Sequence, residues 1–164
     1  MINLRPILNE MILEENENGI MLYRVGGIDK MLDSRKGLFF STNLDYFRNN
    51  DNLGADYSPE KARRYRLLPN AKVFDPAKEF EYFDPNSWWD IRCMMSDLNR
   101  FGIEDECDFE MDEEYGVTST DGLALAGKKL GYDATVIRGI PRDHWMHNPF
   151  DEYAVYNPAV LRRL

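Results

Sequence analysis

The last third of the chain places the tightest constraint on its fold. Two short runs rich in β-branched and aromatic residues, 133–138 and 153–156, flank a loop that holds several prolines and both histidines. Runs of this kind, bounded by turn residues, predict strands. The second run begins directly after Asp151 and Glu152, so two adjacent carboxylates stand at the mouth of a predicted strand. An acidic strand edge is one interpretation, and a position-fixed charge facing a cleft is the other.

Earlier runs of the same type predict four more strands. They cover residues 20–25, 38–42, 62–68 and 72–74, and each is followed by residues that favour turns. The segment 28–36, between the first two of these strands, has no clear periodicity and is interpreted as helix or loop.

Three segments have the apolar spacing of helices. Residues 6–15 carry a first-turn proline, residues 84–101 open with Asp-Pro before an apolar stripe, and residues 121–130 end at Gly131. Strands and helices in this order predict an α+β fold. The helical residues that we expect in the core are Trp88, Ile91, Leu98, Phe101, Leu123 and Leu130.

Length and charge narrow the classes of function. The 164 residues, 43% of them hydrophobic, predict one domain spanning 1–164. Because Lys plus Arg total 20 against 29 Asp plus Glu, the formal charge of −9 disfavours direct nucleic-acid binding. It leaves room for a basic protein partner, or for a small ligand in a local positive pocket. No apolar run reaches membrane-spanning length and no signal peptide is recognisable, so we expect a cytoplasmic protein.

Familiar cofactor and metal motifs are missing from the sequence. It contains no G-x-G-x-x-G and no G-x-x-x-x-G-K-[ST], and its acidic stretch 104–114 lacks the ligand spacing of a calcium loop. His144 and His147 form an H-x-x-H pair without further ligands, so no metal site is predicted. A basic cluster is interpreted as a solvated strand face, with a phosphate or substrate rim as the alternative; its members are Lys61, Arg63, Arg64 and Arg66.

Five short motifs follow one another from Ile20 to Leu161: LYRVGG, GLFFSTN, YRLLPNAKVFD, LAGKKLGYDATVI and DEYAVYNPAVL. In this order they resemble the mono-ADP-ribosyltransferase superfamily, particularly its small phage and bacterial members. The resemblance implies a split pair of small mixed or antiparallel β-sheets with flanking helices. It also implies NAD as co-substrate and a phage or bacterial effector that modifies a host or partner protein, in the host cytoplasm if a phage encodes it.

The resemblance also implies roles for individual residues. In that family a first-strand Arg or His contacts NAD, a second-strand Ser or Thr orders the cleft, and a later Glu is catalytic. The matching positions are Arg24, Ser41 with Thr42 as its possible substitute, and Glu152. The wider set implied for NAD binding is Tyr23, Arg24, Gly26, Phe40 and Ser41.

Two departures from the family pattern leave questions open. Arginine-modifying relatives have a second acid two residues before the catalytic Glu, where this chain has Phe150. The acceptor is therefore not inferred. The second-strand motif reads Ser-Thr-Asn instead of Ser-Thr-Ser, so the working hydroxyl is either Ser41 or Thr42.

A single placed carboxylate suits cleavage of NAD. Nicotinamide is a positively charged leaving group, so the reaction needs no general acid and gains from negative charge near the oxocarbenium-like centre. Strand alternation sends Glu152 to the face opposite Asp151, so only one of the two acids can face the cleft, and we expect it to be Glu152. Hydrolysis of NAD by water and a non-enzymatic acidic inhibitor or binding protein remain as alternative functions.

Overall fold

The computed structural model describes residues 19–34, 36–48, 58–79, 81, 99–100, 111–112, 116–117, 121–139 and 150–164. The predicted helices at 6–15 and 84–101 lie outside these ranges, apart from residues 99–100, as do Trp88, Ile91, Leu98, Phe101 and both histidines. The elements, in chain order, are β1 (Ile20–Val25), β2 (Leu38–Ser41), α2 (Asp45–Arg48), the 3₁₀ helix η2 (Pro59–Lys61), β3 (Ala62–Leu67), β4 (Val73–Phe74), α3 (Pro76–Glu79), β5 (Met111–Asp112), β6 (Gly116–Val117), α5 (Asp121–Lys129), β7 (Ala134–Ile137), β8 (Glu152–Val155), the 3₁₀ helix η3 (Pro158–Val160) and β9 (Leu161–Arg163).

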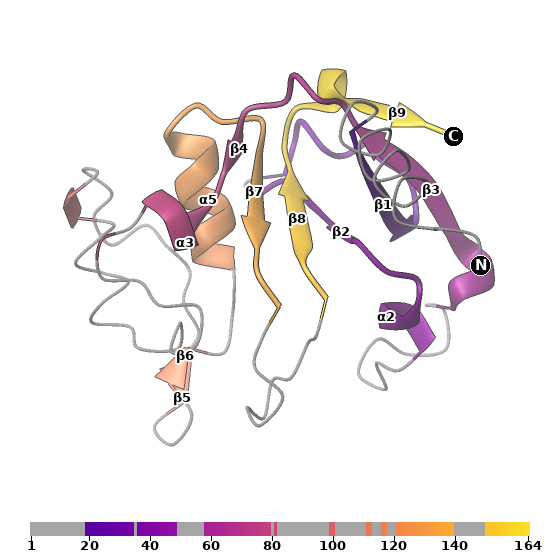
Figure 1. Ribbon diagram of the computed structural model, residues 1–164, viewed down its shortest axis with the longest axis horizontal. Coiled ribbons are helices and arrows are strands. Elements are labelled where there is room, and N and C mark those ends of the chain that lie inside the picture. Colours follow the sequence, from indigo (N-terminus) through magenta and orange to yellow (C-terminus); the bar gives the residue numbers. More distant parts are fainter. Residues whose placement is uncertain are drawn as a thin grey trace, which may run out of the picture.

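The α+β prediction is confirmed, because a seven-stranded sheet dominates the described part of the chain and its helices are few (Figure 1). The strand order is β4-β7-β8-β2-β1-β3-β9, and a separate two-stranded ribbon pairs β5 with β6. Only the β4–β7 pairing is parallel among these ladders. The six strands predicted from alternating runs are all present. Within the acidic segment 104–114, residues 111–112 form β5.

The expected split into two small sheets is wrong for the main strands of the described chain, because β1 to β4 and β7 to β9 form one continuous sheet. The continuity is narrow at one point, since β1 and β2 share the single register pair Tyr23↔Ser41. By contrast, β3 pairs with β1 along its whole length, and β8 does the same with β2. The sheet therefore consists of two well-paired halves joined by a short junction between β1 and β2. Few backbone hydrogen bonds link the two strands beside this junction.

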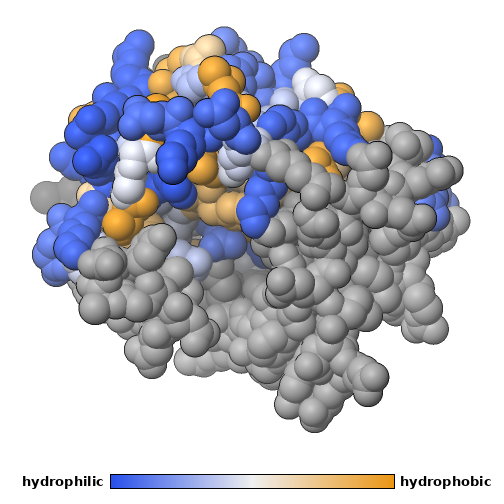
Figure 2. All heavy atoms as spheres, turned by 180° about the vertical axis from the view of Figure 1, so that it is seen from behind, coloured by the Kyte–Doolittle hydropathy of each residue, from blue (hydrophilic) through white to orange (hydrophobic). Residues whose placement is uncertain are grey.

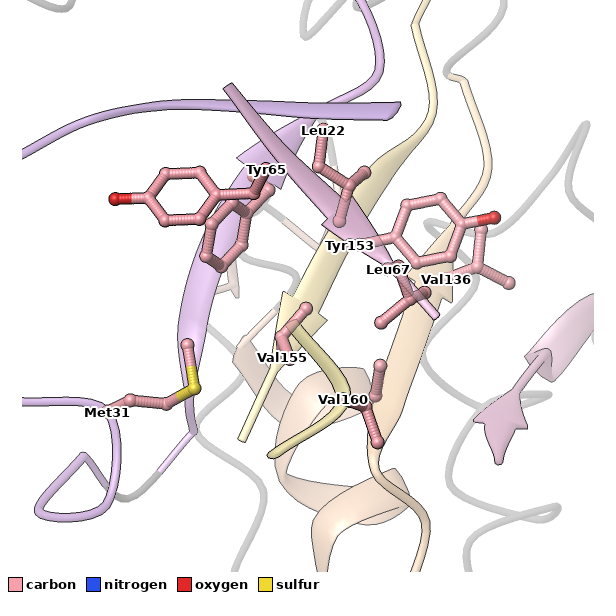
Figure 3. Close-up of a cluster of buried hydrophobic side chains, with 10 residues drawn as sticks. Leu22, Met31, Tyr65, Leu67, Val136, Tyr153, Val155 and Val160 are labelled. Atoms are coloured by element: carbon pink, nitrogen blue, oxygen red, sulfur yellow. The ribbon is translucent and has the colours of Figure 1, made fainter. Parts of the chain in front are cut away.

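One face of the sheet carries the main core. Side chains from both halves meet there, including Leu22 from β1, Tyr65 from β3 and Val155 from β8 (Figure 3). Met31 also joins this core, only 1% exposed, although it comes from the turn between β1 and β2. The segment 28–36 therefore contributes a buried anchor that periodicity did not reveal.

The other face of β7 is covered by α5 (Figure 1). Helix and strand approach closely at Gly127, where an added Cβ would lie 2.0 Å from Thr135 Oγ1. Leu123 is buried as expected, whereas Leu130 is partly exposed because α5 ends at Lys129 and the chain turns away at Gly131. Because β7 is buried on both faces, it is a rigid support for its neighbour β8.

The described surface on the far side is mostly hydrophilic, with hydrophobic side chains in small separate patches (Figure 2). No helix among the described residues is long and apolar enough to cross a membrane.

Candidate active site

A pocket of about 190 Å³ opens beside the β1–β2 junction. Three elements build it: the end of β1, the end of β2 and the first residue of β8, with α2 closing one side. A volume of this size fits one end of a dinucleotide, since pockets for whole drug-sized ligands are about 300–1,000 Å³. The residues lining it are Arg24, Val25, Phe39, Phe40, Ser41, Tyr46, Phe47 and Glu152.

Glu152 enters the pocket from the first position of β8. The β2–β8 register pairs it with Ser41, and directly paired residues of an antiparallel ladder project to the same face. The residue is partly exposed, but its carboxyl group is strongly desolvated, and this desolvation raises its pKa from 4.5 to about 7. A hydrogen bond from the Tyr46 side chain acts in the opposite direction and lowers the pKa. The site therefore holds a carboxyl group that changes charge near neutral pH.

Asp151, the adjacent acid, is fully engaged elsewhere. Its Oδ2 accepts from Arg138 Nη1 at 3.0 Å, and its Oδ1 accepts from the backbone N–H of Gly139 at 2.8 Å. Arg138 also forms an ion pair with Asp75, whose side chain is buried. Asp151 does not line the pocket. The alternation expected from the sequence is confirmed in this respect, because Glu152 lines the pocket while Asp151 binds Arg138 and the Gly139 N–H.

The two candidate hydroxyls also separate. Ser41 lines the pocket, is 1% exposed, and its Oγ donates to the Asn43 carbonyl at 3.0 Å. Thr42 lies outside the pocket lining; its Oγ1 donates to the Asp151 carbonyl at 3.0 Å, and its backbone N–H donates to the same oxygen at 3.1 Å. Ser41 is therefore the hydroxyl that lines the pocket. Thr42 instead binds the backbone carbonyl of Asp151, directly before Glu152.

Arg24 lies next to the last residue of β1 and lines the pocket from there. Its Nη1 donates to the Phe39 carbonyl at 2.9 Å and its Nε to the Gly27 carbonyl at 3.3 Å. Its guanidinium carbon lies 5.7 Å from the centre of the Phe40 ring. These two bonds orient the guanidinium across the junction.

The remaining predicted residues divide between pocket and support. Phe40 lines the pocket and also belongs to the core, at 2% exposure. Tyr23 forms the register pair with Ser41 but is not among the lining residues. Gly26 ends β1 with a φ of +97°, a conformation that favours glycine, and an added Cβ there would meet nothing within 4 Å. Gly26 therefore shapes the turn beside Arg24.

Sequence reasoning missed Tyr46 and Phe47. They lie on α2, a four-residue helix whose start is capped by Asn43, with the Asp45 N–H donating to Asn43 Oδ1 at 2.8 Å. A one-turn helix has no periodicity that could have assigned its aromatic residues to the pocket.

No group of three or more His, Cys, Asp or Glu residues suited to a metal ion exists within the described ranges. No family model, curated protein or solved structure matches the chain.

Proposed function

We propose that this protein is a mono-ADP-ribosyltransferase that transfers ADP-ribose from NAD to a macromolecular acceptor, a host or partner protein. The observation that carries the proposal is the pairing of Glu152 with Ser41 on the floor of a pocket that Arg24 also lines. The order of the motifs along the chain supports the same assignment. NAD is the co-substrate in this proposal, and no metal is required.

The chemistry follows from the placement of one carboxylate. The C1′–N bond of the nicotinamide riboside breaks, and its electron pair stays on nicotinamide, which leaves as a neutral molecule. Ionised Glu152 stabilises the oxocarbenium-like centre at C1′ and can receive the proton that the acceptor loses when its nucleophilic atom bonds to C1′. Arg24 holds a phosphate of NAD. Ser41 orients the ribose or Glu152 itself.

The test uses labelled NAD, a cell lysate and two matched variants of adjacent acids. Wild-type protein is expected to label an acceptor band, while Glu152→Gln loses on the order of a hundred- to a thousandfold in rate. Asp151→Asn is expected to retain measurable transfer, because Asp151 lies outside the pocket lining. If Asp151→Asn is inactive and Glu152→Gln is active, the site assignment is wrong.

Two other outcomes would favour the alternative functions. Release of nicotinamide without any labelled macromolecule would indicate an NAD glycohydrolase that uses the same site. No heat of NAD binding in calorimetry, together with no nicotinamide release, would instead favour a non-enzymatic acidic binding protein.

A further inference from the structure

We propose that Arg63 is the second cation of a diphosphate-binding site, which it forms with Arg24 beside the pocket that Arg24 lines. This inference deepens the proposed function, on which it rests for the identity of the diphosphate as the one within NAD. Nothing in the sequence motifs separated Arg63 from its basic neighbours. The assignment comes from the strand register.

Strands β1 and β3 lie side by side (Figure 1), and Arg24 and Arg63 are direct partners in their ladder. Such partners have Cβ atoms about 4.5–5.5 Å apart and project to the same face. Like charges in this arrangement destabilise a sheet unless an anion lies between them or near them. The pairing therefore places two positive charges side by side at the end of β1 that borders the pocket.

Both guanidinium groups approach Gly27. Arg24 Nε donates to its carbonyl at 3.3 Å, and a Cβ added at Gly27 would lie 4.0 Å from Arg63 Nη1. Because residue 27 has no side chain, it adds no atoms beyond its backbone near the two arginines. The same added Cβ would lie 3.1 Å from Asp29 Oδ2, so one carboxylate also lies beside Gly27.

Arg63 is exposed, and its side chain forms no ion pair or hydrogen bond with another residue of the described chain. Its neighbour Arg64 is also exposed but pairs with Tyr23, and strand alternation sends it to the opposite face. Arg64 therefore serves as a control of the same residue type on the same strand.

A diphosphate matches this pair better than a single anion does. Each guanidinium is a planar fork that can hold two oxygens of one phosphate, so two adjacent forks suit two linked phosphates. The pocket itself has room for one end of a dinucleotide, which leaves the diphosphate outside it. Arg24 lines the pocket, and Arg63 lies directly opposite Arg24 on the neighbouring strand.

The test compares ADP with adenosine as calorimetric probes, using the whole chain. Wild-type protein is expected to bind ADP more tightly than adenosine, with an ADP affinity that falls as salt increases. Arg63→Gln should lose about ten- to a hundredfold in ADP affinity and leave adenosine binding unchanged. Arg63→Lys should recover only part of the loss, because lysine lacks the fork. Asp29→Asn should strengthen ADP binding, since it removes the carboxylate beside the site.

The control is Arg64→Gln, which should bind ADP within about twofold of wild type, and melting curves verify that every variant is folded. The inference would be overturned if Arg63→Gln and Arg64→Gln lost ADP affinity equally, or if Arg63→Gln lost none. It would also be overturned if the wild-type protein did not bind ADP. Arg63-dependent ADP binding without any NAD turnover would retain the diphosphate site and reject the transferase. NAD turnover that depends on Glu152, together with unchanged ADP binding in Arg63→Gln, would retain the transferase and reject the diphosphate site.

Discussion

Glu152→Gln should make the protein more stable while it removes activity. The folded-state pKa of Glu152 is raised from 4.5 to about 7, chiefly by desolvation. A raised folded-state pKa in an acid means that the native state holds the proton more strongly than the unfolded chain does. Stability associated with this group is therefore fully present below pH 4.5 and is lost as the pH rises through about 7.

The size of the effect follows from the same shift. The pKa of Glu152 rises from 4.5 to about 7, a shift of about 2.5 units. At about 1.4 kcal/mol per unit, the ionised carboxylate lowers the free energy of unfolding by about 3 kcal/mol above pH 7. Glutamine removes the charge but keeps the shape, although its amide N–H groups need partners in the pocket, which offsets about 1 kcal/mol. We therefore expect Glu152→Gln to gain about 1–2 kcal/mol over wild type at pH 8 and little or nothing at pH 4.5.

Urea unfolding of both proteins at pH 4.5 and pH 8 measures this difference directly, because other titrating groups affect both proteins alike. Asp151→Asn is the matched control and should change stability in the opposite direction, by about 1 kcal/mol, since it weakens the bonds to Arg138 and to the Gly139 N–H. If Glu152→Gln is equally destabilising at both pH values, the carboxyl group is not desolvated in the pocket, and the reasoning about its charge fails.

Three further expectations concern the site and its support. NAD turnover at low NAD should rise with pH around a midpoint near 7, because the ionised form of Glu152 stabilises the transition state; a flat profile from pH 6 to 8 would contradict this. Arg24→Ala should weaken NAD binding in calorimetry by about ten- to a hundredfold, with partial recovery in Arg24→Lys. Arg138→Gln should lower the free energy of unfolding by about 2 kcal/mol, because it leaves the buried carboxylate of Asp75 without its main partner; a loss below about 0.5 kcal/mol would rule out that role.

Much of the sheet could be predicted from the sequence because alternation and turn residues are local signals. The runs around Leu22, Phe40 and Tyr153 each carry enough β-branched and aromatic residues to identify a strand. Local signals also placed Glu152 at a strand mouth and on the face opposite Asp151. The α+β class followed from the order of these elements.

Other features depend on which strands meet, and no local pattern contains that information. The pairing of Arg24 with Arg63 joins residues separated by a long connection that includes β2 and α2. The single Tyr23↔Ser41 pair replaced the expected gap between two sheets, because the family resemblance supplied an architecture but no register. Met31 was missed for a similar reason, since its turn has no periodicity and only tertiary packing buries it.

Arg24 combines two roles that a single substitution cannot separate. Its Nη1 bonds to the Phe39 carbonyl across the junction where β1 and β2 share one register pair, so it helps to join the two halves of the sheet. It is also one of the residues that line the pocket. Loss of NAD binding in Arg24→Ala could therefore arise from a widened junction as well as from a missing cation. The side chain of Arg63 forms no such hydrogen bond across the sheet within the described chain, although Arg63 lies directly opposite Arg24. Binding measurements on Arg63 variants consequently isolate the charge effect, and Arg24 variants gain a clear meaning only when they are compared with them.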